Sequence, residues 1–279
     1  MTHGALRCIR LALFPLVLAT WALNRQPDAQ VVELVDALAS GASGRKAVEV
    51  RVLSWAPLYF SPLWACERPD RADTSEIVTN HLHRGDLPSN VSFNGSVAVD
   101  TETMGLRLNR DRLCVIQLSG GDGHSHIVQI VQGQSAPNLV RVFADTTILK
   151  IFHFARFDLA MLQRQFGVRC TPVYCTRTAS RLTRTNTDKH GLKDLCKELL
   201  GVELSKQQQT SDWGAAQLSQ DQVDYAAADV LYLHRLKAEM DKMLAREGRA
   251  ALAEACFKFL PDRAALDLAG WADEDIFAH

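Results

Sequence analysis

Two carboxylates in the middle of the chain are spaced so that they could bind a metal ion together. Asp100 and Glu102 come at the end of an apolar stretch and stand two residues apart. If this stretch is a β-strand, its period of two places both carboxylates on one face. Like charges held that close repel each other, and a hard divalent cation bound by both would remove the repulsion. Alternatively, the two residues begin a polar loop in which Asp100 caps a turn.

Two further carboxylates and a tyrosine lie in helical patterns. Asp158 falls in a first helical turn, where an acidic residue also stabilises the helix dipole by ~0.3–1 kcal/mol. Tyr225 and Asp229 stand four residues apart and therefore share one helix face. The three residues between them are alanines, which let the helix approach another backbone closely. Tyr225 could instead pack in the core and Asp229 could take a surface partner, although an unpaired carboxylate is costly beside the apolar residues that follow.

Hydrophobic periodicity places these residues at the ends of regular elements. Apolar, β-branched runs predict strands at 96–101, 113–118, 126–131 and 148–154. Helical patterns predict helices at 137–144, 155–166, 192–200 and 219–245. The last helix begins with Ser219 and has Gln222 three residues later, which is the spacing of a capping box. Three strands followed by strand–helix units predict an α/β domain with a mixed sheet.

The composition excludes several classes of protein. The chain has 279 residues, of which 47% are hydrophobic and 23% charged, so it can bury a core and is neither disordered throughout nor collagen-like. Its net charge of −1 gives no overall attraction to nucleic acid or to an anionic membrane, so a basic surface would have to be local. The seven cysteines are irregularly spaced, which indicates buried thiols in a reducing compartment rather than a zinc site or disulfide framework.

Residues 1–75 differ from the rest of the chain. Arg7 and Arg10 precede an apolar run at 11–23, in the order found in a secretory signal. The run is shorter than the ~20 residues needed to span a bilayer, so no stable membrane partner is expected. We predict an N-terminal extension or targeting segment at 1–75 and one domain at 76–279 with a helical C-terminal end. The expected location is cytoplasmic, with secretion as the alternative if the segment is a signal.

Three motifs together are much more specific than the separate residues. They are Val-Asp-Thr-Glu-Thr at 99–103, His-Phe-Ala-Arg-Phe-Asp-Leu at 153–159 and Asp-Tyr-Ala-Ala-Ala-Asp-Val-Leu-Tyr-Leu at 224–233. In this order and at these separations they resemble the motifs of the DEDD (DnaQ-like) superfamily of 3′–5′ exonucleases, and in particular its ribonuclease D-like group. The resemblance covers residues 80–245 and implies a ribonuclease H-like mixed β-sheet flanked by helices.

The resemblance is to the tyrosine form of this superfamily. Tyr225 stands four residues before Asp229, whereas the position at which the histidine form has its catalytic residue is Asp224 here. The sequence departs from the family pattern at Phe154, where asparagine is common. About 35 residues follow residue 245, too few for the HRDC domains of full-length ribonuclease D, so a short form is implied.

The resemblance also implies phosphodiester hydrolysis by a two-metal mechanism. Asp100, Glu102 and Asp229 would hold the Mg²⁺ or Mn²⁺ ion that activates water, and Asp100 with Asp158 would hold a second ion. Tyr225 would orient the attacking water, because its ordinary pKa of ~10 makes full proton abstraction less favourable. Such enzymes release nucleoside 5′-monophosphates from a free 3′ end.

The residues directly after the first motif would line the 3′-terminal nucleotide in this family. Here they are Thr103, Met104, Gly105 and Leu106. Leu106 or Met104 would be an apolar wedge against the last bases, with ordinary core packing as the alternative for both. Wedging without readout of base edges predicts weak sequence preference.

A basic segment follows the second motif. Arg177, Arg181 and Arg184 recur at helical spacing, and lysines continue as far as Lys206. These charges form either a solvated face or a surface that contacts phosphates. Both interpretations are compatible with the sequence.

The expected protein is a metal-dependent 3′–5′ exonuclease that shortens nucleic acid from a free 3′ end. RNA is favoured over DNA, as in RNA 3′-end processing, only because of the ribonuclease D-like resemblance. A single-strand DNA exonuclease of the same fold is one alternative, and a non-catalytic nucleic-acid-binding module is another. The presence of all four carboxylates and Tyr225 argues against the non-catalytic module. The sequence does not specify an oligomeric state.

Overall fold

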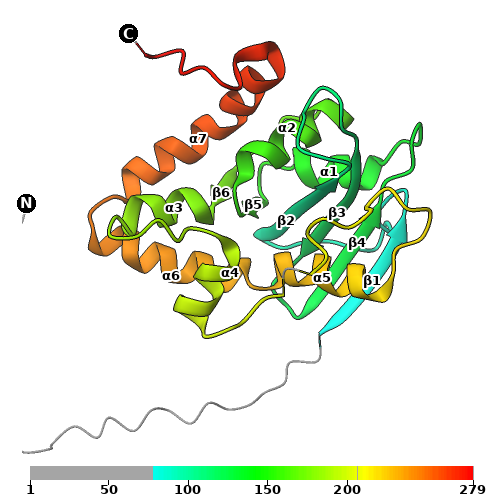
Figure 1. Cartoon of the computed structure of the whole chain (residues 1–279), viewed down its shortest axis with the longest axis horizontal. Coiled ribbons are helices and arrows are strands. Elements are labelled where there is room, and N and C mark those ends of the chain that lie inside the picture. The colour runs from blue at the N-terminus through cyan, green and yellow to red at the C-terminus, as the bar shows by residue number, and fades with distance from the viewer. Residues whose placement is uncertain (1–77, 206, 279) are drawn as a thin grey trace, which may run out of the picture. The chain divides into compact units, whose positions relative to one another are not determined.

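The computed structural model describes residues 78–205 and 207–278. Its centre is a six-stranded sheet with the strand order β1-β4-β3-β2-β5-β6 (Figure 1). The strands are β1 (Thr79–Arg84), β2 (Ser96–Thr103), β3 (Leu113–Ser119), β4 (His124–Gln129), β5 (Leu149–Phe152) and β6 (Val173–Cys175). The segment predicted at 1–75 lies outside the described residues, as does Lys206.

The sheet is mixed. β2, β3 and β4 form an antiparallel meander, whereas β1 runs parallel to β4, β5 parallel to β2, and β6 parallel to β5. The carboxyl ends of β2, β5 and β6 therefore meet at one edge, where such sheets commonly bind ligands. The register of β2 against β3 shifts between Glu102 and Thr103, so β2 is irregular immediately after its second carboxylate.

Helices connect the strands and cover the sheet. Those of the described residues are α1 (Pro137–Ala144), α2 (Ala155–Phe166), α3 (Thr176–Thr183), α4 (Leu192–Leu195), α5 (Gln220–Leu231), α6 (Leu233–Arg246) and α7 (Ala250–Leu266), with π-helical turns at Cys196–Leu200 and Asp267–Trp271. In this part of the chain, no helix combines the length and the apolar character that crossing a bilayer requires.

Two hydrophobic clusters form because both faces of the sheet are covered. Val115 and Ile127 pack with Ala226 of α5, whereas the alternate residues Ile116 and Val128 belong to the larger core that includes α1 and α2. Every residue of β3 is buried for this reason. The uninterrupted apolar run that predicted this strand is thus a consequence of its central position.

The α/β class with a mixed sheet is confirmed, and two helices have the predicted bounds, 137–144 and 155–166. The predicted stretch at 219–245 is helical, but a one-residue turn at Tyr232 (φ −101°, ψ −5°) divides it into α5 and α6. The prediction at 192–200 is helical throughout but ends in a π-helical turn.

Strand predictions were less accurate at the edges of the sheet. The strand predicted at 126–131 spans 124–129, since its pairing with β1 begins at His124. The sequence did not predict β1, whose residues are mostly polar because this strand lies at the sheet edge. Likewise β6, with three residues, is too short for a periodic pattern.

Candidate active site

The carboxyl end of β2 presents side chains to both faces of the sheet. Glu102 pairs with Val115, which packs against α5, so Glu102 and Asp100 point to the α5 side. Thr101 points to the other side and donates a hydrogen bond from Oγ1 to Oδ1 of Asp158 at 2.5 Å. Asp158 lies in the first turn of α2 and is buried. One short strand end therefore positions three of the predicted carboxylates.

Helix α5 carries the fourth carboxylate and the tyrosine. It begins at the predicted capping box, in which Ser219 and Gln222 each bond to the other's backbone. Ala226 and Ala227 are buried against the sheet and bring the helix close to it. The following turn carries Asp229 to the end of β2. The small residues are thus what allows the helix to approach.

Three carboxylates converge within a distance that one metal ion can bridge. Asp100, Glu102 and Asp229 each offer an oxygen, and these oxygens lie within 4.8 Å of one another. Asp158 lies beside this group, bonded to Thr101 and close enough for its charge to act on Glu102. The structure therefore brings together all four predicted carboxylates from β2, α2 and α5.

No nearby lysine or arginine balances the charge that the four carboxyls carry when they are ionised. In residues 78–205 and 207–278, none of the four carboxylates forms an ion pair with lysine or arginine. Burial raises the pKa of Asp100 to about 7, and burial together with the three neighbouring charges raises the pKa of Glu102 to about 10. Burial and the charge of Asp100 also raise the pKa of Asp158 and of Asp229. A donor set made only of carboxylate oxygens fits a hard divalent cation, which would remove this repulsion.

The Tyr225 hydroxyl is kept in its protonated form. Burial raises the pKa of Tyr225, and the charges of Asp229, Glu102 and Asp100 raise it further. Its ring lies 6.0 Å from the ring of buried Trp213, measured between centroids. The tyrosine can therefore donate a hydrogen bond beside the carboxylates.

Helix α2 is anchored from the C-terminal part of the chain. Arg156, two residues before Asp158, donates to both carboxylate oxygens of Asp267 at 2.5 and 2.8 Å and to the carbonyl of Ala272 at 2.5 Å. Asp267 is buried and also pairs with Arg263 at 2.9 Å. These bonds fix the helix turn that carries Asp158.

The predicted substrate-contact residues after β2 form an exposed turn. Leu106 is 84% exposed and Met104 51% exposed, so neither is an ordinary core residue. Thr103 closes the turn by donating from Oγ1 to the carbonyl of Gly105 at 2.6 Å. A side chain at Gly105 would collide with the carboxylate of Asp111, since an added Cβ would lie 2.4 Å from it.

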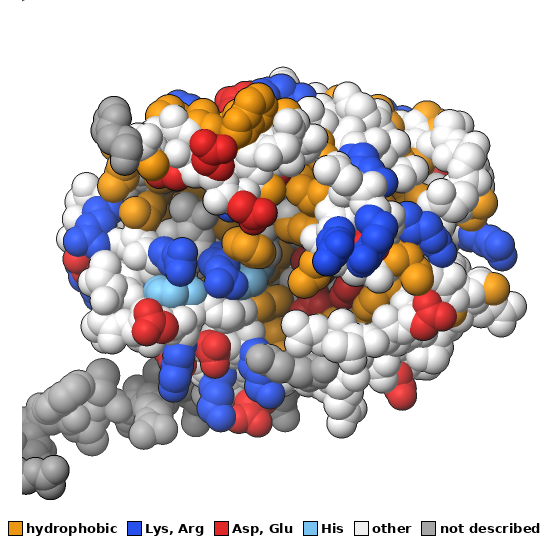
Figure 2. Space-filling view, turned by 45° about the horizontal axis from the view of Figure 1, so that its top comes forward, with side chains coloured by type: hydrophobic (Ala, Val, Ile, Leu, Met, Phe, Trp, Pro, Cys, Tyr) orange, Lys and Arg blue, Asp and Glu red, His pale blue; other side chains and the backbone are white. Residues whose placement is uncertain are grey.

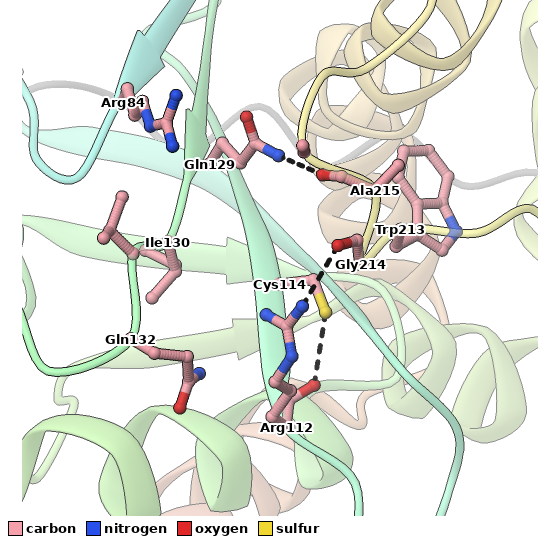
Figure 3. Close-up of a pocket in the computed structure, with 11 residues that line it drawn as sticks. Arg84, Arg112, Cys114, Gln129, Ile130, Gln132, Trp213, Gly214 and Ala215 are labelled. Carbon is pink, nitrogen blue, oxygen red and sulfur yellow. Dashed lines mark hydrogen bonds between the residues drawn. The ribbon is translucent and has the colours of Figure 1, made fainter.

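A polar pocket of about 170 Å³ is lined by residues that include Arg112, Gln129 and Trp213 (Figure 3). Arg112 donates to the carbonyl of Gly214 at 3.2 Å, and Gln129 donates to the carbonyl of Ala215 at 2.6 Å. The N–H of Met104 donates to the carbonyl of Arg112 at 3.0 Å. The turn after β2 is thus tied to the segment that leads into α5. The sequence motifs did not indicate this link.

The predicted basic residues have different environments. Arg177, on α3, places its guanidinium 4.6 Å from the centroid of the Phe154 ring, and Arg181 is exposed. Arg184 is buried and donates hydrogen bonds to Glu198 and to the carbonyl of Lys189. The prediction that it belongs to a solvent-facing basic surface is therefore wrong. Figure 2 shows a hollow with acidic side chains at its bottom and lysine and arginine side chains on its rim.

Phe154 has a conformation that sequence reasoning missed. It caps the start of α2 in the left-handed region (φ 70°, ψ 42°), which is strained for a bulky side chain. Phe154 is 49% exposed, although it is a large apolar residue. The only available signal was that asparagine, which tolerates this conformation well, is common at the corresponding family position.

Comparisons with known proteins agree with this geometry. The model of a family described as 3′-5′ exonuclease matches residues 75–245. Ribonuclease D of Granulibacter bethesdensis is 34% identical over 155 residues, which cover 56% of this chain and 39% of that protein. The chain therefore spans well under half the length of this curated relative.

Two solved structures are more similar. Brucella melitensis NrnC with bound Mg²⁺ is 58% identical, with a TM-score of 0.69 over 71% of this chain and 98% of that one. The structure titled Brucella melitensis NrnC bound to pGG is also 58% identical, with a TM-score of 0.70 over 72% of this chain and 99% of that one.

The fold and the carboxylate site define a nuclease domain that acts on nucleic acid. The chain belongs to the 3′–5′ exonuclease family. Within that family it is similar to NrnC and to ribonuclease D. The predicted ribonuclease H-like fold and the prediction of an exonuclease enzyme are confirmed. Members of this family use divalent metals, in agreement with the acidic cluster.

Proposed function

We propose that this protein is a ribonuclease D-like exonuclease that removes nucleoside 5′-monophosphates from the 3′ end of RNA. The observation that carries the proposal is the convergence of Asp100, Glu102 and Asp229 beside Asp158, without a lysine or arginine pairing with them in the described residues. Such a site is complete only with cations. Similarity to NrnC with bound Mg²⁺ supports magnesium as the metal, with manganese as its substitute.

Each carboxylate has a separate task in this proposal. Asp100, Glu102 and Asp229 would hold one divalent ion, and Asp100 with Asp158 would hold a second. When bound, such ions would supply an activated water and neutralise charge on the phosphoryl group. Thr101 keeps Asp158 in place through its 2.5 Å hydrogen bond. The carboxylates must be ionised to bind, so metal binding releases the protons that the empty cluster retains.

Tyr225 orients the attacking water. Because its hydroxyl stays protonated, it donates a hydrogen bond and does not act as the base. Water attacks the phosphorus of the last phosphodiester bond, and the bond to the 3′ oxygen of the preceding nucleotide breaks. This leaving 3′ oxygen gains the proton that the water loses. The product is a nucleoside 5′-monophosphate.

The exposed turn after β2 holds the end of the substrate. Leu106 inserts beside the terminal bases, and Met104, Gly105 and Thr103 line the nucleotide. Apolar contact with base faces does not distinguish the four bases, so the proposed enzyme has little sequence preference. The guanidinium groups of Arg177, at the start of α3, and Arg181, one turn further along it, contact substrate phosphates in this proposal.

Short RNA is the proposed substrate class. The NrnC relative that is 58% identical has been solved with pGG, a name that denotes a 5′-phosphorylated dinucleotide. The similarity extends over 99% of that relative. We therefore infer that oligomers of a few nucleotides bind here.

The proposed place of action is the cytoplasm. The cysteines of the described residues, Cys114, Cys170, Cys175, Cys196 and Cys256, are free thiols, and the first four are buried. Thiols that remain unpaired are typical of a reducing compartment. This supports the location predicted from the spacing of the cysteines.

The test uses 5′-labelled single-stranded RNA, its DNA counterpart and a 5′-phosphorylated RNA dinucleotide, each with Mg²⁺ or Mn²⁺. The expected result is shortening from the 3′ end that EDTA and Asp100→Ala abolish, with RNA degraded faster than DNA. Faster DNA degradation would favour a DNA exonuclease. Binding without cleavage under either metal would refute the enzymatic proposal and favour a binding module.

A further inference from the structure

Gln117 is a fully buried amide in the middle of the sheet. It lies on β3 and is 0% exposed. It stands directly opposite Asp100 in the pairing of β3 with β2, and opposite Ile127 in the pairing of β3 with β4. Residues directly opposite on antiparallel strands share a face, with their Cβ atoms about 4.5–5.5 Å apart. Ile127 packs against α5, so the Gln117 side chain lies on the α5 face of the sheet, beside Asp100.

The amide of Gln117 makes no hydrogen bond with its polar atoms. Within residues 78–205 and 207–278, neither Nε2 nor Oε1 of Gln117 has a partner, and both atoms are buried. A buried amide without partners destabilises a folded protein, whereas an apolar side chain of the same shape does not. The stability of the metal-free fold therefore gives no reason for a glutamine at this position.

The surroundings of Gln117 leave the Asp100 carboxyl as its partner. Val115, two residues before it on β3, and Ile127, opposite it on β4, are both apolar. Ser119, two residues after it, already donates from Oγ to a backbone carbonyl at 2.7 Å. The Asp100 carboxyl lies directly across the strand pair, at a separation that a glutamine side chain can span.

The role proposed for Asp100 requires a carboxylate that is held in one orientation. Asp100 is assigned to both ions, whereas Glu102, Asp158 and Asp229 are each assigned to one. A carboxylate has about four lone-pair sites, so binding two ions leaves sites that can accept from an N–H group. A hydrogen bond to a metal-binding side chain orients it and strengthens metal binding. Thr101 already donates such a bond to Asp158 on the other face of β2, at 2.5 Å.

We propose that Gln117 is a positioning residue for the metal site: its Nε2 group donates a hydrogen bond to the Asp100 carboxylate when that carboxylate is ionised and binds cations. The inference rests on the proposed function, since it assumes that Asp100 binds metal. Gln117 acts through Asp100 and does not itself contact the reacting atoms. Its unpaired amide lowers the stability of the metal-free protein and gains a partner in the metal-bound protein.

The test compares the wild type with Gln117→Met, which replaces the amide by an apolar side chain of similar length. The electron paramagnetic resonance signal of free Mn²⁺ measures the metal affinity directly, and this affinity should fall about tenfold or more in the variant. In EDTA the urea midpoint of the variant should equal or exceed that of the wild type, because an unpaired buried amide has been removed. In cleavage assays the Mg²⁺ concentration that gives half the maximal rate should rise by a similar factor, with KM for RNA unchanged.

Ser119→Ala is the matched control, because it removes a buried polar group from the same face of the same strand. Oγ of Ser119 donates to the carbonyl of His124 at 2.7 Å and accepts from the N–H of Gly121 at 3.2 Å. The control should therefore lower the urea midpoint in EDTA and leave the Mn²⁺ affinity unchanged. Circular dichroism shows whether each variant is folded, and Gln117→Leu provides the same test if Gln117→Met is not.

Three results would overturn the inference. If the wild type binds Mn²⁺ and the Gln117 variants bind it equally well, Gln117 does not position Asp100, and the proposed function is unaffected. If the Gln117 variants have a lower urea midpoint than the wild type in EDTA, the amide is already paired in the metal-free protein and its role is structural. If the wild type binds no Mn²⁺, the proposed function is refuted and the inference with it.

Discussion

Replacing Asp100 by asparagine should make the metal-free protein more stable, although it abolishes activity. Burial raises the pKa of Asp100 from its ordinary 3.8 to about 7. In the folded state this carboxyl therefore binds its proton more tightly than in the unfolded chain. By linkage, the contribution of this carboxyl to the stability of the metal-free protein is fully present below pH 4 and falls as the pH rises from about 4 to about 7. Above that pH the loss is complete.

The size of the effect follows from the pKa change. A rise from 3.8 to about 7 corresponds to at most about 4 kcal/mol at neutral pH and above. Glu102, Asp158 and Asp229 share the cluster and adjust their own protonation, and the Asp100 side chain is partly open to solvent. We therefore expect Asp100→Asn to gain about 1–3 kcal/mol at pH 8.

The assay is urea unfolding in EDTA at pH values from 4 to 8, followed by far-UV circular dichroism. Wild type and Asp100→Asn should coincide near pH 4, where the carboxyl is neutral, and separate as the pH rises. Asp188→Asn, which changes an exposed aspartate, is the matched control and should follow the wild type. Adding Mg²⁺ should stabilise the wild type more than the variant. Equal or lower stability of Asp100→Asn at pH 8 in EDTA would show that burial does not raise the pKa of the Asp100 carboxyl in the folded protein.

Four other changes test separate parts of the site. Tyr225→Phe should lower kcat about 100-fold with little change in KM, because only the hydrogen bond to the attacking water is lost. Steady-state kinetics on RNA measures both constants, and a rise in KM alone would contradict this role. Leu106→Ala should lower kcat/KM for RNA about tenfold. Its Tm should be unchanged, because the side chain is 84% exposed, and a large fall in Tm would assign Leu106 to the core. Phe154→Asn should keep or raise the Tm, since asparagine tolerates a φ of 70°, and a lower Tm would argue against strain at this position. Asp267→Ala should cost about 2–3 kcal/mol in urea unfolding, since it leaves the Arg156 guanidinium without its buried carboxylate, and an unchanged stability would refute the anchoring of α2.

The residues of the site could be predicted from the sequence where the pattern that places them is local. The period of a strand placed Asp100 and Glu102 on one face, and the period of a helix placed Tyr225 above Asp229. Their convergence depends on the order of the strands and on the packing of α5, which short-range spacing does not contain. The resemblance to a known family provided that step.

Other features depend on long-range contacts and were not predictable. Arg184 has the spacing of a surface residue on α3, but Glu198 and the carbonyl of Lys189 bind it in the interior. The break at Tyr232 follows a sequence that is helical by composition. Phe154 is apolar and directly precedes a helix, and nothing in its type indicates a left-handed conformation.

The anchoring of α2 has a consequence for how the enzyme is made in the cell. Asp158 is oriented by a helix turn that Arg156 ties to Asp267 and Ala272, more than 100 residues further along the chain. A ribosome that has completed the region matched by the exonuclease family, which ends at residue 245, has not yet synthesised this anchor. The nascent chain can therefore contain every catalytic motif and still lack a rigid second motif. Nuclease activity should therefore arise only after synthesis has passed Ala272 and this segment has left the ribosome.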